Sequence, residues 1–271
     1  MGLLTSTNTY NNAFAGVPAM AIELDITKTS STPQFDVGFG FTRADGNKYR
    51  YVQYGNTVVA GNVCVSSSDT GLVADTDNAV IEPAAAIAVA GESILPGKIG
   101  SRYVEFTKAS IVKNQLAGGY FVTTDGTGIG YTYRIKGNTA TGDPASGNLR
   151  VELYEPLKVT LTSTTDVAMV GSRWAAIEQS IIAVNYAVCG IACAGGSDGK
   201  YGWVCTHGVS AVTTDAGVPT AIGQQLAVST TTGGTVTKLN PLETGNILSG
   251  IGYCLDIGDS AGCSTVYLQI E

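Results

Sequence analysis

The sequence predicts an all-β protein made of two β-sandwich or β-barrel-like domains with an extended N-terminal arm. Its 271 residues include 35 glycines, which supply the backbone conformations of tight turns. Charged residues make up 14% of the chain, against roughly a quarter in average soluble domains. Long helix-forming runs of Glu, Lys, Leu and Arg are missing. Apolar residues instead alternate with polar ones in short runs, the period of half-buried strands.

One phrase recurs along the chain and organises it. Its fullest form spans residues 200–208, where strand alternation places Tyr201, Trp203 and Cys205 on one face. Val204 and Thr206 then occupy the other face. Related phrases occur at residues 48–55 and 102–106. Their uneven spacing argues against a solenoid, so the phrase predicts one strand-turn-strand unit that is reused in two domains.

The arm comprises residues 1–22. It shows neither helical nor strand periodicity, and Gly16 and Pro18 disfavour a regular element. Two interpretations remain open, a frayed terminus and an extended segment that orders on a neighbouring subunit. On the second interpretation, the contact residues are Tyr10, Phe14, Val17 and Met20.

The first β domain is expected at residues 23–165. From Phe35 to Phe41 an apolar side chain occupies every second position, which predicts a half-buried strand over 35–43. An Asp-Gly pair at 45–46 then predicts a hairpin turn. Further strands are expected at residues 21–25, 48–54, 80–89, 102–106, 118–122, 131–136 and 149–157.

The second β domain is expected at residues 166–271, after a Thr-rich boundary at 160–166. Residues 170–179 fit either a helical turn or a strand, and the pattern does not decide between them. Strands are expected at 187–194 and 200–206, and a closing hairpin at 251–257 and 264–270.

The six cysteines mostly lie in apolar, strand-like runs, where a thiol acts as a small buried hydrophobe. Cys189 and Cys193 share a strand face, but a zinc site needs further ligands and the chain has one histidine. We therefore expect no metal. Cys254 and Cys263 could face each other across a hairpin, although we favour the reduced form.

The sequence offers little for catalysis. His207 lies two residues from Cys205, so on a regular strand the two side chains share a face and a cysteine nucleophile is conceivable. The glycine-rich residues 125–130 precede a strand, whereas a phosphate loop precedes a helix. Carboxylates that could serve a glycosidase are present but unpaired in the sequence: Asp36, Glu105, Glu152, Glu155 and Glu178. We expect no enzymatic activity and no cofactor.

Charge and hydropathy limit the partners. The net charge is −7 and the 15 Lys and Arg residues are scattered, which disfavours nucleic acid and anionic membranes. No apolar run approaches the roughly 20 residues of a membrane-spanning helix. Gly2 and Ser6 match a myristoylation pattern, but a single acyl chain anchors weakly.

Several segments together resemble the head decoration (cement) proteins of tailed bacteriophages: residues 45–55, 59–63, 200–208, 223–228 and 251–253. The resemblance implies a β-barrel or β-sandwich protein that coats the outer surface of the assembled head and stabilises contacts between major capsid proteins. It further implies a homo-oligomer, a trimer rather than a dimer, located on the virion exterior after synthesis in the host bacterial cytoplasm. The contact residues of the arm would then bind capsid or a neighbouring subunit.

Two other functions compete with this one. A virion-surface adhesion or carbohydrate-binding module would present exposed aromatic residues, for which Tyr51, Tyr54, Tyr133 and Trp203 are candidates. A cysteine hydrolase would use Cys205 and His207.

Overall fold

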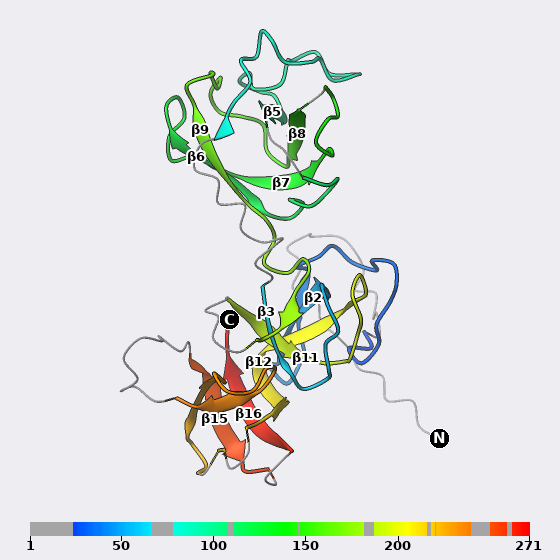
Figure 1. Ribbon diagram of the computed structural model, residues 1–271, viewed down its shortest axis with the longest axis vertical. Coiled ribbons are helices and arrows are strands. Elements are labelled where there is room, and N and C mark those ends of the chain that lie inside the picture. Colours follow the sequence, from blue (N-terminus) through cyan, green and yellow to red (C-terminus); the bar gives the residue numbers. More distant parts are fainter. Residues whose placement is uncertain are drawn as a thin grey trace. The chain divides into compact units, whose positions relative to one another are not determined.

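The computed structural model describes residues 24–66, 78–107, 111–145, 147–181, 187–215, 218–219, 221–239, 250–258 and 262–271. Within these ranges every regular element is a strand (Figure 1). The expected all-β fold is therefore confirmed. The N-terminal arm, with its contact residues Tyr10, Phe14, Val17 and Met20, lies outside the described residues.

The chain forms two compact units. One comprises the described residues of Met1–Ser67 and Arg173–Glu271, and the other those of Ser68–Ser172. This division differs from the sequential one expected at residue 165. The physical reason is a long-range strand pairing, in which Tyr51 of the first phrase lies opposite Trp203 of the last. The two phrases are thus neighbours in one sheet.

The first unit contains a ten-stranded antiparallel sheet. Its strands are β1 (Gly40–Thr42), β2 (Lys48–Gln53), β3 (Val63–Val65), β10 (Glu178–Gln179), β11 (Val188–Ala192), β12 (Tyr201–Thr213), β13 (Gln225–Val228), β14 (Val236–Lys238), β15 (Gly250–Asp256) and β16 (Cys263–Gln269). The order is β10-β3-β11-β12-β16-β15-β13-β14, and β2 pairs with both β1 and β12. The long strand β12 joins the two halves, because its first half pairs with β2 and β11 and its second half with β16.

Strand β12 is buried on both faces over its first half. Trp203 and Cys205 belong to one hydrophobic cluster, and Val204 belongs to another. This distribution confirms the predicted faces. Around Trp203, the ring centroids of Phe41, Tyr51 and Phe35 lie at 4.9, 5.0 and 5.4 Å.

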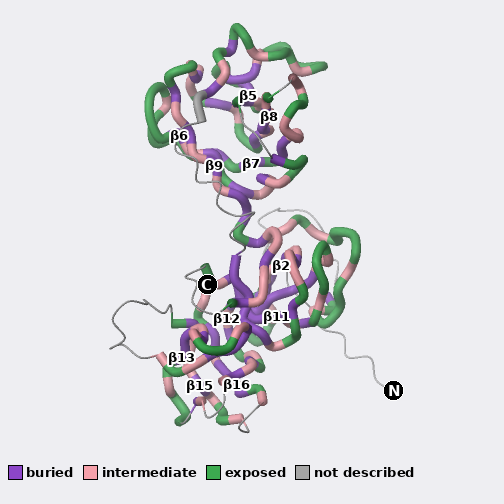
Figure 2. Tube along the Cα trace, viewed as in Figure 1, coloured by how far each residue is buried: buried purple, intermediate pink, exposed green. Residues whose placement is uncertain are grey.

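The second unit contains six strands: β4 (Asn78–Ala79), β5 (Tyr103–Thr107), β6 (Tyr120–Asp125), β7 (Thr132–Asn138), β8 (Asn148–Leu153) and β9 (Asp166–Val170). Their order is β4-β9-β6-β7-β8-β5. A bridge between Val80, directly after β4, and Phe106 of β5 links the two ends of this order. The sheet is therefore curled into a barrel-like form. Figure 2 shows buried residues along the strands of both units and exposed residues in the loops.

Alternation on β7 and β8 follows the sequence closely. Tyr133, Ile135, Leu149, Val151 and Leu153 point inward and are at most 4% exposed. The intervening residues are half-buried or exposed until β7 reaches its last two residues. One layer of side chains thus fills the interior of the second unit.

Some expected elements differ from the structure. Residues 35–43 form a strand only at Gly40–Thr42, because Gly38 adopts a φ of +89° that turns the chain. Phe35 and Val37 consequently pack against different clusters. Residues 80–89 contribute a single bridge, at Val80, and continue as a turn and irregular structure. Residues 171–177 form turns and irregular structure between β9 and β10, with no helix.

One glycine is required where β12 meets the loop before β2. Gly208 has a φ of +92°, a conformation that side-chain-bearing residues rarely adopt. The Asn47 side chain lies against it and binds Val209 twice, accepting from its N–H at 2.9 Å and donating to its carbonyl at 3.1 Å. A Cβ atom on Gly208 would overlap the Asn47 amide.

We predict that Gly208→Ala lowers the free energy of unfolding of the first unit by about 2–3 kcal/mol, from backbone strain and lost hydrogen bonds. Urea unfolding followed by tryptophan fluorescence measures this, since Trp174 and Trp203 both lie in that unit. Gly223→Ala is the control. Gly223 has a φ of +81° but open space around a Cβ, so its loss should be near 1 kcal/mol. Equal losses would contradict the role of Asn47.

Candidate functional site

The cysteine–histidine pair does not share a face in the structure. Cys205 lies opposite Tyr49, whereas His207 lies opposite Lys48, because the register with β2 shifts between them. Adjacent strand residues point to opposite sides, so this shift separates the thiol from the imidazole. The expectation of a shared face is therefore wrong, and a β-bulge that sequence spacing cannot reveal is the reason.

Each member of this pair is engaged elsewhere. The Cys205 thiol lies in the core and donates to the His207 carbonyl at 3.4 Å. Burial raises the pKa of Cys205 to about 11, so the thiol stays protonated near neutral pH. The His207 ring contacts the Glu271 main-chain oxygen through Nδ1 at 3.0 Å and the Tyr267 hydroxyl through Nε2 at 3.2 Å. The pair therefore lacks the thiolate that a cysteine hydrolase needs.

All six cysteines are free. Burial raises the pKa of Cys189 to about 12 and raises the pKa of Cys64 and Cys193 as well. Cys254 and Cys263 do not face each other. Cys254 is buried opposite Val266, and Cys263 is exposed opposite Thr213.

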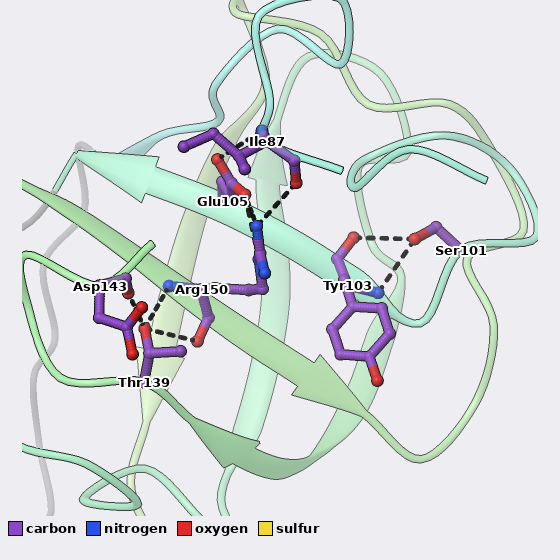
Figure 3. A network of polar contacts seen from close by, with 7 residues as sticks. All are labelled: Ile87, Ser101, Tyr103, Glu105, Thr139, Asp143 and Arg150. Carbon is purple, nitrogen blue, oxygen red and sulfur yellow. Dashed lines mark hydrogen bonds and ion pairs between the residues drawn. The ribbon is translucent and has the colours of Figure 1, made fainter. Parts of the chain in front are cut away.

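Two of the candidate carboxylates, Glu105 and Glu152, are bound to basic side chains within the second unit. Glu105 is fully buried, and its Oε1 accepts from Nε and Nη2 of Arg150 at 3.0 and 2.6 Å. Its Oε2 accepts from the Ile87 N–H at 3.3 Å, and Arg150 Nη2 donates to the Ile87 carbonyl at 2.7 Å. Figure 3 shows how these contacts fasten the loop at Ile87 onto β5 and β8. Glu152, which like Arg150 lies on β8, is bound to Lys136 of β7 at 2.6 Å.

Asp215, which follows β12, lies in a cage of hydroxyl groups. Thr231 and Thr235 donate to its carboxylate at 3.0 and 2.7 Å, and Ser229 donates as well. Burial alone would raise the pKa of Asp215, but these hydrogen bonds outweigh burial and lower its pKa. The Asp215 carboxylate thus holds the connection between β13 and β14 through these hydrogen bonds.

The four aromatic candidates for a sugar-binding surface are buried. Tyr51, Tyr54, Tyr133 and Trp203 are 2, 0, 4 and 3% exposed. The prediction that they form an exposed surface is wrong, because each lies on the inward face of its sheet or under a loop. The alternation of β8 in the sequence places Tyr154 on the outward side, directly after the strand. The Tyr154 side chain is indeed exposed.

A shallow cavity of about 430 Å³ opens on the first unit. Tyr49, Cys193, Cys205, Ser210 and Cys263 contribute to its lining. The described lining is uncharged, and burial keeps the thiols of Cys193 and Cys205 protonated. The cavity is therefore lined mainly by small uncharged groups. Cys193 and Cys205 supply no thiolate to it near neutral pH.

The described ranges hold no cluster of three or more His, Cys, Asp or Glu side chains placed to bind a metal ion. In the same ranges the chain forms no helix with the length and apolarity that a membrane crossing requires. Comparison with protein-family models, curated proteins and solved structures finds no match to this chain.

We predict that a single thiol, Cys263, reacts rapidly with a thiol reagent such as DTNB in the native protein at pH 8. The other five are shielded or held protonated by burial. Unfolding in guanidinium should release all six. Cys263→Ser should abolish the rapid phase, and a rapid phase that survives this change would contradict the assignment.

We also predict that Arg150→Met lowers the free energy of unfolding of the second unit by about 3–5 kcal/mol, because it leaves the buried Glu105 carboxylate without its cation. Hydrogen exchange of residues 79–107 measures the effect. Lys136→Met is the matched control, since it breaks an exposed ion pair with Glu152 on the same sheet and should change stability little. Comparable effects of the two changes would show that burial of the pair is unimportant.

Proposed function

We propose that this chain is a viral capsid decoration protein that binds the outer surface of an assembled phage head and stabilises contacts between major capsid proteins. The observation that carries the proposal is the surface of the second unit. This smaller unit bears most of the exposed large hydrophobic side chains in the described part of the chain. Its aliphatic members are Ile87, Ile94, Ile99, Val112 and Ile129.

Part of this surface is held in place before any partner binds. The loop that carries Ile87 is fastened to β5 and β8 by the Glu105–Arg150 contacts (Figure 3). Further along the same connection, the Ile99 N–H donates to the Thr160 hydroxyl at 3.0 Å. A loop that is already ordered loses less conformational entropy on binding. Its exposed side chains, Ile99 at 59% and Ile87 at 41%, are therefore suited to a lasting contact.

The composition of the chain supports permanent contacts with neighbouring subunits of a capsid. A charge content of 14% leaves hydroxyl and small apolar groups over much of the surface. Many modest contacts made by repeated copies add up to strong attachment, because each bound neighbour raises the effective concentration of the next. On this proposal the partners are the major capsid protein and further copies of the chain as a trimer. The location is the exterior of the virion after synthesis in the bacterial cytoplasm.

Cosedimentation with capsids assembled from the major capsid protein of the same virus tests the proposal. We expect the wild-type chain to saturate a fixed number of sites and to raise the temperature at which the shells open. Ile99→Asp should weaken binding at least about tenfold. Ile222→Asp is the control, since Ile222 is 70% exposed but lies in the first unit. A wild-type chain that stays in the supernatant would overturn the proposal.

Deleting residues 2–20 tests the contact residues of the arm. On the proposal the truncated chain folds but no longer binds capsids, because the deletion removes all four contact residues, Tyr10, Phe14, Val17 and Met20. Circular dichroism checks the folding. Undiminished binding by the truncated chain would remove the arm from the proposal while leaving the surface of the second unit in it.

A further inference from the structure

Three side chains form a row across neighbouring strands of the second unit. Tyr120 of β6 lies directly opposite Arg134 of β7. Tyr154, which follows β8, donates its N–H to the Arg134 carbonyl at 3.0 Å. The Arg134 guanidinium carbon lies 4.9 Å from the centre of the Tyr154 ring. The row Tyr120–Arg134–Tyr154 thus crosses β6, β7 and the end of β8 on the outward face.

The tyrosines of this row are exposed where most other aromatic residues are covered. Tyr120 is 50% and Tyr154 is 37% exposed. Within the described ranges the remaining exposed aromatic residue is Tyr131, at 42%. A tyrosine ring combines an apolar face with a polar hydroxyl, which suits it to ligands that are apolar on one side and hydroxylated at the edge.

Charged groups of both signs border the row. Lys136 is bound to Glu152 at 2.6 Å, and Glu155 accepts from the Arg134 N–H at 3.4 Å. Arg102 also donates to the Tyr154 carbonyl. Three cations and two carboxylates therefore border the tyrosines. A polyanion would meet the carboxylates and a polycation the basic groups. A neutral ligand rich in hydroxyl groups can use both kinds of hydrogen-bonding partner.

The geometry favours an extended ligand. Neighbouring strands lie about 4.8 Å apart, so Tyr120 and Tyr154, two strands apart, are separated by about 10 Å. This separation is close to the length of a disaccharide. The row lies on an outward sheet face, which matches a linear chain better than a compact molecule that requires enclosure.

We propose that the row Tyr120–Arg134–Tyr154 binds a neutral, linear oligosaccharide. The two tyrosine rings stack against sugar faces, and Arg134, Lys136 and Glu152 exchange hydrogen bonds with the sugar hydroxyls. Packing against Arg134 holds the Tyr154 ring in place before binding, which lowers the entropic cost. This function is independent of capsid attachment and rests on different residues from those tested above.

A printed array of neutral and acidic oligosaccharides, probed with the full-length labelled chain, tests the inference. Titration calorimetry with the best neutral oligosaccharide then compares variants. Tyr120→Ala and Tyr154→Ala should each weaken binding about tenfold, as expected from the loss of one aromatic contact. Tyr131→Ala is the matched control. Tyr131 is similarly exposed in the same unit, but it stands in phase with the inward Tyr133 and packs beside that ring.

Several outcomes would overturn the inference. The first is a wild-type chain that binds no glycan, or that binds only acidic glycans. The second is equal affinity of the wild type and of the two variants of the row. The third is an equal loss of affinity in these two variants and in the control Tyr131→Ala. Tyrosine variants that lose capsid binding and leave glycan binding intact would assign the row to the shell. Thermal unfolding checks that each variant is folded, since all three positions are exposed.

Discussion

The packing of β12 is the constraint on which the first unit depends. Its first half is covered on both faces, with Trp203 and Cys205 in one cluster and Val204 in the other. A strand buried on both sides has to satisfy all its backbone groups through its neighbours. Strands β2, β11 and β16 provide these partners. The unit consequently has to gather segments from both ends of the chain around one strand.

The two units use aromatic residues differently. In the first, Phe35, Phe41 and Tyr51 surround Trp203 and contribute to the interior. In the second, Tyr120 and Tyr154 stand on the outside of the sheet. Burying an aromatic ring stabilises a fold. An exposed ring contributes this free energy only when a ligand or partner covers it. The second unit also buries aromatic residues, since Phe106, Phe121 and Tyr133 lie in its core; it differs from the first unit in the exposed tyrosines that it adds to this core.

Alternation within a strand could be predicted from the sequence, because it depends on residues that are neighbours in the chain. The faces of β12 and the inward residues of β7 and β8 follow from this rule. Long-range events could not be predicted. The pairing of Tyr51 with Trp203 joins positions that a local pattern treats as separate repeats, and the bulge between Cys205 and His207 reverses the side of one residue. Aromatic type alone does not distinguish the buried Tyr133 from the exposed Tyr154.

The second unit is continuous in sequence, whereas the first is not. The chain leaves the first unit after β3 and returns to it at β10, and these two strands pair with each other through Glu178 and Val65. As a chain emerges from the ribosome, Ser68–Ser172 can complete its barrel-like sheet at once. Strands β2 and β3 must wait for β11 and β12 before their edges are covered. The second unit can therefore fold while the chain is still being synthesised, whereas the first unit can complete its sheet only after β12 has been made.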